Sequence, residues 1–140
     1  MIGFIVSGHG RFASGISASV ELIMGETSHY EMVDFQYGET ASELEKNIDD
    51  AINRLKDCEE IIAFTDLLSG SPFNMWSLAS FKDERIHVIY GTNLAMLIDS
   101  ILKRNMGASC EEIIESAIEN GKQQIGVFRK ALIDADEFDE

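Results

Sequence analysis

The chain of 140 residues has few cysteines and prolines and no long hydrophobic run, and each shortage excludes a class of protein. Its single proline and eleven glycines exclude a fibrous or low-complexity chain. Its apolar stretches are far shorter than the ~20 residues of a membrane span, and the start lacks the features of a secretory signal. We therefore expect a cytoplasmic globular protein without a membrane-inserted segment. The two cysteines, Cys58 and Cys110, are expected to be free thiols without a metal-binding partner.

Basic residues are also scarce. Aspartate and glutamate outnumber lysine and arginine by 25 to 11, which gives a net charge of −14. Such a charge repels nucleic acid and anionic lipid and attracts a basic partner. Part of the excess lies in residues 131–140, an acidic C-terminal tail, whereas residues 1–130 have the length and apolar content of one domain.

Strand-like and helix-like patterns alternate along the chain. Short apolar runs of strand length occupy residues 1–6, 30–35, 60–65 and 86–90, with a possible last strand at 125–128. Apolar residues recur at helical spacing in residues 12–24, 44–55, 72–81, 94–102 and 110–120, the last ending at Gly121. Helices of this length join parallel strands by right-handed crossovers. The pattern therefore predicts an α/β fold with a doubly wound, mainly parallel sheet and helices on both of its faces.

The most informative residue is His9, which stands between Gly8 and Gly10 where the first strand is expected to end. Open α/β sheets bind their ligands at the carboxyl ends of the strands. Imidazole titrates near neutrality and is a good nucleophile, and the start of a helix favours an anionic group. His9 is therefore a candidate acceptor of an anionic group. We expect His29 and His87, which lack this setting, to be structural or solvent-exposed.

Polar residues also follow the third and fourth strands, so the parallel sheet should bring them close to His9. A carboxylate at Asp66 could hold one imidazole nitrogen protonated and leave the other with a free lone pair. Ser71, the expected cap of the helix that begins at Pro72, offers a hydroxyl and a helix N-terminus to a phosphate. The turns at these strand ends hold Ser69, Gly70, Thr92 and Asn93 as well.

Together, the Ser-Gly-His-Gly around His9 and the Thr-Asp-Leu-Leu-Ser-Gly-Ser-Pro-Phe-Asn that contains Asp66 resemble the mannose-family enzyme IIA component of the bacterial sugar phosphotransferase system. The Val-Asp-Phe at 33–35 and the Gly-Thr-Asn-Leu-Ala-Met-Leu at 91–97 extend this resemblance over most of the chain. The sequence departs from it at Leu68 and Ser69, where some relatives carry tryptophan and glycine.

The resemblance implies a phosphocarrier that works without a cofactor or metal ion. His9 would accept a phosphoryl group on Nε2 from phospho-HPr and pass it to the IIB component, which serves the membrane IIC/IID permease. Asp66 would orient His9, and Gly10 and Ser71 would bind the phosphoryl group. The resemblance also implies a flavodoxin-like architecture and a homodimer in which the segment at 121–128 joins the partner's sheet. It leaves the transported sugar undetermined.

Two alternatives stay open at this point. A related domain serves as the phosphotransfer subunit of dihydroxyacetone kinase systems, and copurification with kinase subunits would indicate that role. A doubly wound sheet of this length could also be a flavodoxin-like ligand-binding module. The Gly-His-Gly-Arg after the first strand replaces the glycine-rich fingerprints of dinucleotide and P-loop proteins, which weakens the nucleotide interpretation. Flavin absorbance would identify a flavoprotein.

Overall fold

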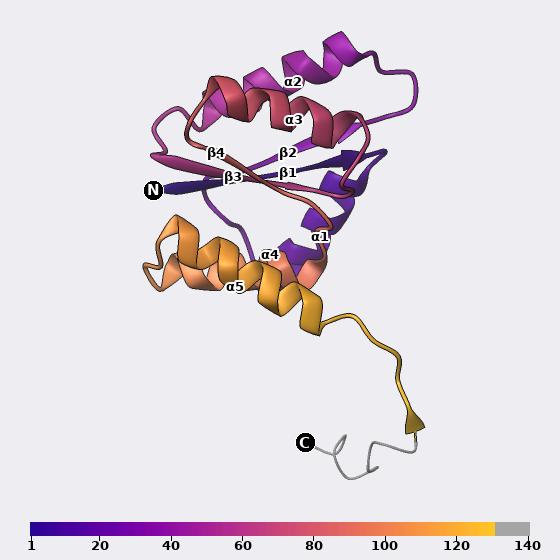
Figure 1. Ribbon diagram of the computed structural model, residues 1–140, viewed down its shortest axis with the longest axis vertical. Helices are drawn as coiled ribbons and strands as arrows, with labels where there is room; N and C mark the ends of the chain where they lie inside the picture. The colour runs from indigo at the N-terminus through magenta and orange to yellow at the C-terminus, as the bar shows by residue number, and fades with distance from the viewer. Residues whose placement is uncertain (131–140) are drawn as a thin grey trace.

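The computed structural model describes residues 1–130, in which strands and helices alternate up to the last two helices (Figure 1). The strands are β1 (Ile2–His9), β2 (Tyr30–Phe35), β3 (Glu60–Thr65) and β4 (Ile86–Ile89). The helices are α1 (Phe12–Met24), α2 (Ala41–Arg54), α3 (Ser71–Lys82), α4 (Leu94–Asn105) and α5 (Cys110–Gln123). The acidic tail expected at 131–140 lies outside the described residues. Within residues 1–130, no helix is long and apolar enough to span a bilayer.

The sheet is parallel throughout and has the strand order β2-β1-β3-β4. Helices α2 and α3 cover one face, and α1, α4 and α5 cover the other (Figure 1). The predicted α/β fold class, with helices on both faces, is confirmed. The chain runs outward from β1 to β2 and then returns to β3 on the other side of β1. The switch point of the doubly wound sheet therefore lies between the carboxyl ends of β1 and β3.

The central strand β1 is buried on both faces, which explains its continuous apolar run. Phe4 and Val6 pack in the core beneath α1, α4 and α5, whereas Ile5 packs in the core beneath α2 and α3. The rings of Phe4 and Phe64, from neighbouring strands, meet edge to face with centroids 5.7 Å apart. Such a pair contributes about 0.5–1.5 kcal/mol beyond its buried area.

Three expected boundaries were wrong. Strand β1 continues past residue 6 because its last residues still pair with β2, ending with His9 opposite Phe35. Helix α3 begins at Ser71 with Gly70 in the capping position, so Ser71 is not the cap. Helix α5 passes through Gly121 and ends at Gln123. A Cβ at Gly121 would come within 2.5 Å of the Met96 side chain, so this glycine allows α4 and α5 to pack closely instead of ending the helix.

The expected last strand at 125–128 does not form within this chain. Beyond α5 the backbone leads away from the body of the fold and has no strand structure (Figure 1). The side chains of Ile125 and Val127 are 77% and 65% exposed. A strand needs the backbone of a neighbour, and α5 ends with this segment directed away from the sheet. Among the described residues, β4 pairs only with β3 and has an open edge.

Candidate functional site

His9 and Asp66 meet at the switch point, one at the end of β1 and the other directly after β3. His9 Nδ1 lies 2.9 Å from Asp66 Oδ2, and the backbone N–H of His9 donates to the same oxygen at 2.9 Å. The backbone N–H of Leu67 donates to Oδ1, also at 2.9 Å. With Nδ1–H donated to the carboxylate, the lone pair of His9 is on Nε2. The sheet thus brings together the two side chains expected to converge, while their chemical roles stay predictions.

The surroundings of Asp66 keep its carboxyl group ionised. Burial alone raises the pKa of Asp66, but the hydrogen bonds from the backbone N–H and ring of His9 and from the Leu67 N–H outweigh it. The net result is a pKa below the usual value for aspartate. The side chain of Asp66 is 13% exposed and that of His9 is 43% exposed. A mostly buried anion therefore supports an imidazole that is open to solvent.

Two glycines allow this close packing. A Cβ at Gly8 would lie 2.6 Å from the Phe12 ring and 2.9 Å from the Asp66 carboxyl group. A Cβ at Gly70 would lie 2.6 Å from Cε1 and 2.7 Å from Nε2 of His9. Gly70 also has a φ of +102°, a conformation that favours glycine. In the sequence Gly70 is recognisable only as a turn residue, because nothing local indicates that it contacts a ring on another strand.

The start of α3 lies beside the reactive side of His9, because its capping residue Gly70 adjoins Nε2. No side chain caps this helix, and the helical ladder begins with the Asn74 N–H donating to the Gly70 carbonyl at 2.9 Å. The first turn contains the N–H groups of Ser71 and Phe73, whereas Pro72 has none. An uncapped helix N-terminus favours an anion. The hydroxyl of Ser71 does not cap the helix, and the phosphate contact expected of Ser71 stays a prediction.

On the other side of His9, the backbone is fixed by β2. The N–H of Gly10 donates to the Phe35 carbonyl at 2.7 Å, so this amide is already engaged in a hydrogen bond. The phosphate contact expected of Gly10 stays a prediction. Asp34 accepts hydrogen bonds from the N–H and the hydroxyl of Ser14, at 3.0 and 2.7 Å. It thereby holds the first turn of α1. This role of Asp34 was not predicted from the sequence, although a charged residue within a strand was a usable signal.

Other polar residues at the strand ends have structural roles. The Thr92 N–H donates to the Thr65 carbonyl at 3.1 Å. Asn93 caps α4 by accepting from the Met96 N–H at 3.1 Å, and its amide donates to the Gly121 carbonyl at 3.0 Å. These bonds fix the turn after β4 and do not involve His9. His29 is exposed to solvent, which agrees with the expectation, and its backbone carbonyl accepts from the Phe4 N–H at 2.8 Å.

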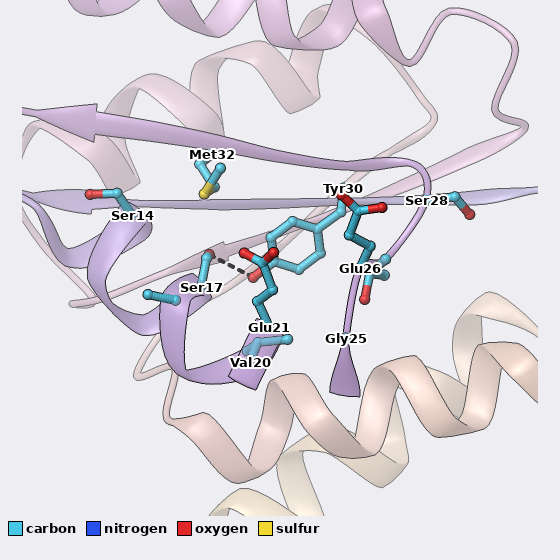
Figure 2. Close-up of a pocket in the computed structure, with 11 residues that line it drawn as sticks. Ser14, Ser17, Val20, Glu21, Gly25, Glu26, Ser28, Tyr30 and Met32 are labelled. Atoms are coloured by element: carbon cyan, nitrogen blue, oxygen red, sulfur yellow. Dashed lines mark hydrogen bonds between the residues drawn. The ribbon is translucent and has the colours of Figure 1, made fainter. Parts of the chain in front are cut away.

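A cavity of about 630 Å³ lies away from this site, between α1 and β2 (Figure 2). Its lining includes Ser17 and Tyr30, whose hydroxyl oxygens are 2.7 Å apart, together with Glu21 and Met32. Neither His9 nor Asp66 lines it. The candidate site is therefore an exposed position on the edge of the sheet, separate from this cavity.

Comparison with known proteins decides the family. A family model described as PTS system fructose IIA component matches residues 3–118. The chain belongs to this IIA family. It is 27% identical over 124 residues to the mannose-specific EIIAB component of Escherichia coli K12, covering 89% of this chain and 38% of that relative. It is 32% identical over 101 residues to the sorbose-specific EIIA component of Lacticaseibacillus casei, covering 72% of each. This IIA chain thus spans well under half of the EIIAB relative.

Solved structures agree with this assignment. The phosphotransferase component EIIA of Streptococcus agalactiae superposes on the IIA chain with a TM-score of 0.83 and 32% identity, covering 91% of this chain and 98% of that one. The mannose/sorbose-specific IIA subunit of Enterococcus faecalis has a TM-score of 0.80 at 21% identity, covering 91% and 94% of the two chains, and supports the fold. The resemblance inferred from the motifs around His9 and Asp66 is confirmed at the level of the family.

The surroundings of Cys110 in the IIA chain differ from expectation. Both cysteines are free thiols, as the sequence predicts. However, Cys110 does have other metal-binding side chains beside it, because Glu60 and His87 lie close to it in space. Within residues 1–130 this is the one group of three such side chains found, and it lies at the amino ends of β3 and β4, remote from His9. The sequence distances between the three residues hid this proximity.

Proposed function

We propose that this IIA chain carries phosphoryl groups in a sugar phosphotransferase system, on Nε2 of His9. The observation that carries the proposal is the orientation of the imidazole, with Nδ1 on Asp66 and Nε2 beside the start of α3. Nε2 attacks the phosphorus of phospho-HPr. A new N–P bond forms on His9 as the N–P bond to HPr breaks, and the bonding electron pair returns to the HPr imidazole. Transfer to a histidine of the IIB component repeats this exchange.

The chemistry requires alignment and charge stabilisation more than covalent machinery. The phosphorylated imidazole keeps its proton on Nδ1, and the negative charge of Asp66 stabilises the positive charge that develops on the ring. Ser71 and the first N–H groups of α3 bind the phosphoryl oxygens. These local donors offset the repulsion between a phosphate dianion and a chain of net charge −14.

The exposure of His9 supports a protein as the phosphoryl donor and acceptor. A side chain that is 43% exposed at the rim of a sheet can be approached in line by a histidine on another protein surface. The partners are phospho-HPr and the IIB component, through which the group reaches the IIC/IID permease in the membrane. The transfer takes place in the cytoplasm and involves no nucleic acid. Relatives named for mannose, fructose and sorbose leave the sugar open.

A homodimer completes this proposal. A groove of about 330 Å³ between β4 and α5 is lined by apolar side chains that include Ile89, Ile114 and Ile118. Residues 125–128 of a second copy can pair with the open edge of β4 and place Ile125 or Val127 in such a groove. Removing residues 125–140 should give a monomer in light scattering, whereas removing 131–140 alone should leave a dimer with twice the mass of the truncated chain. The same oligomeric state for the two truncated chains would contradict a dimer built by residues 125–128.

The experiment that tests the carrier function is labelling from phosphoenolpyruvate in the presence of enzyme I and HPr. The wild-type chain should acquire an acid-labile, alkali-stable phosphate, and His9→Asn should acquire none. The matched control is His29→Asn, because asparagine tolerates the positive φ of 53° at that exposed position. Labelling of the His9 variant at the wild-type rate would exclude the proposal. None of the observations favours the kinase-subunit or flavodoxin-like alternatives.

A further inference from the structure

Three metal-binding side chains meet at the amino edge of the sheet. Glu60 is the first residue of β3, His87 lies in β4, and Cys110 is the first residue of α5. One ligand atom from each residue lies within 4.8 Å of the ligand atoms of the other two. We propose that Glu60, His87 and Cys110 bind a zinc ion, with a water molecule as the fourth ligand.

The ligand types and their spacing fit zinc. Thiolate sulfur, imidazole nitrogen and carboxylate oxygen are its usual protein ligands, at about 2.0–2.3 Å in a tetrahedral arrangement. Ligand atoms around such an ion are therefore about 3.3–3.8 Å apart. His87 Nε2 and Glu60 Oε2 are 2.6 Å apart and share a hydrogen bond. Zinc replaces this hydrogen bond when the two atoms move apart by about 1 Å and the imidazole carries its proton on Nδ1, so that the Nε2 lone pair faces the ion.

The backbone holds the three ligands in place without a metal ion. Strands β3 and β4 are paired directly, with Ile61 opposite Ile86 and Ile62 opposite His87. The start of α5 is fixed by Ser109, whose hydroxyl accepts the Glu112 N–H at 3.2 Å. Two paired strands and a capped helix start therefore present the ligands. The side chains of His87 and Glu60 are 40% and 41% exposed, which leaves access for the ion and for a water ligand.

The charge around Cys110 favours a cation. The carboxylates of Glu60 and Glu111 lie close enough to Cys110 to act on it electrostatically, and they attract a divalent cation. When zinc binds, the thiol releases one proton to solvent as the S–Zn bond forms. Glu60 and the Cys110 thiolate together then balance the two positive charges of the ion.

The zinc site is remote from His9. In the pairing of β1 with β3, Glu60 lies opposite Ile2 and Thr65 lies opposite Ser7. Six residues of extended chain separate Glu60 from Asp66, about 20 Å. Figure 1 shows the turn between α4 and α5 at the same edge of the sheet as the N-terminus, opposite the arrowhead of β1. A zinc ion here joins β3, β4 and α5 and takes no part in phosphoryl transfer.

The test is titration of the full, metal-free chain with Co²⁺, which replaces zinc and reports its ligands by absorbance. The wild-type chain should bind one equivalent with the visible bands of a tetrahedral ion and a thiolate-to-cobalt charge-transfer band, and Zn²⁺ should remove both. Cys110→Ser should lose the charge-transfer band. His87→Gln should weaken Co²⁺ binding by about tenfold or more, since even the outer partners of metal ligands have effects of this size.

The matched controls are Cys58→Ala, which removes the other, buried thiol, and His9→Asn, which removes the imidazole of the phosphoryl site. Both should keep the full cobalt spectrum. Zn²⁺ should also raise the thermal midpoint of the wild-type chain by several degrees and leave that of Cys110→Ser unchanged. The proposal is overturned if the wild-type chain gives no charge-transfer band, if that band survives in Cys110→Ser, or if it disappears in Cys58→Ala. None of these readouts depends on phosphoryl transfer.

Discussion

The two edges of the sheet each place a histidine against a carboxylate, yet their surroundings favour opposite charges. At the carboxyl edge, Asp66 accepts two backbone N–H groups besides the His9 ring, and the uncapped start of α3 adjoins Nε2. At the amino edge, the partner of His87 is Glu60, and Cys110 and a second carboxylate are close by. Backbone N–H groups favour an anion at the first edge, whereas carboxylates and a thiol favour a cation at the second.

This comparison teaches that a histidine–carboxylate pair does not define a site by itself. In our two proposals, the same two groups serve a phosphoryl group where helix N–H groups lie beside the free nitrogen, and a metal ion where further anionic ligands lie beside it. Variants at the carboxyl edge test its side of the comparison, and Gly70 is expected to have the largest effect.

Gly70→Ala should have the largest effect. The new Cβ would lie 2.7 Å from His9 Nε2, so the ring must move or its reactive nitrogen is covered. We expect labelling from phospho-HPr to fall by about 100-fold or more, because small misplacements of a reacting group have effects of this size. The control is Gly107→Ala, between α4 and α5, where φ is also positive at +82° but nothing lies within 4 Å. Equal labelling rates in the two variants would show that Gly70 does not position His9.

Asp66→Asn should slow phosphoryl transfer by about 100-fold with little loss of fold, because it removes the negative charge at almost constant shape. The amide oxygen can still accept the Nδ1 proton, so the variant separates charge from orientation. Asp50→Asn, at an exposed position paired with Lys46, is the matched control and should transfer at the wild-type rate. Stopped-flow or quenched-flow measurement of transfer from phospho-HPr checks both variants. Wild-type rates in Asp66→Asn would remove this carboxylate from the mechanism.

Ser71→Ala should slow transfer by about tenfold, the effect of one hydrogen bond to a charged group. The helix N–H groups remain, so the loss is smaller than at Asp66. Ser69→Ala, two residues earlier in the same turn, is the control and should leave the rate unchanged. The rates are measured in the same transfer assay. If the two serine variants behave alike, the phosphoryl group does not contact the Ser71 hydroxyl.

The smallest effect should appear in stability against pH. Because the pKa of Asp66 is lowered in the folded chain, its ionised form stabilises the fold above the unfolded pKa of ~3.9, and this contribution is lost as pH falls through the folded value. The difference in the free energy of unfolding between wild type and Asp66→Asn should therefore be constant above pH of about 5 and shrink below pH of about 4. Denaturant unfolding across this range measures it. A difference that does not change with pH would contradict the assignment.

Much of the fold was predictable because its signals are local. The apolar runs of β1 and β3 and the helical spacing in α2 each depend on residues within a few positions of one another. Besides the end of β1 and the cap of α3, the exceptions were Gly121 and the segment 125–128. A glycine that ends one helix and a glycine that admits a neighbouring helix look the same in sequence, and here Met96 on α4 decides. The strand expected at 125–128 does not form among the described residues, in which β4 pairs with β3 alone.

The candidate site was predictable in part. Placing His9 at a strand end required only local patterns, and its convergence with Asp66 followed from the general geometry of parallel sheets. The contact of Gly70 with the ring, the use of Asn93 as a helix cap and the hydrogen bonds of Asp34 to Ser14 did not follow. Each depends on how helices are set against the sheet, which the sequence pattern does not specify.

By itself the sequence determined the alternating elements, the parallel sheet and the position of His9 at the end of β1, because the periods of strands and helices and the chemistry of turns act over a few residues. Only the tertiary structure decided whether the surroundings of each histidine favour an anion or a cation. Strand order and register set His9 against a carboxylate 57 residues away, and they set His87 beside both Glu60 and Cys110. Such contacts arise from the packing of the whole chain, so no local pattern contains them.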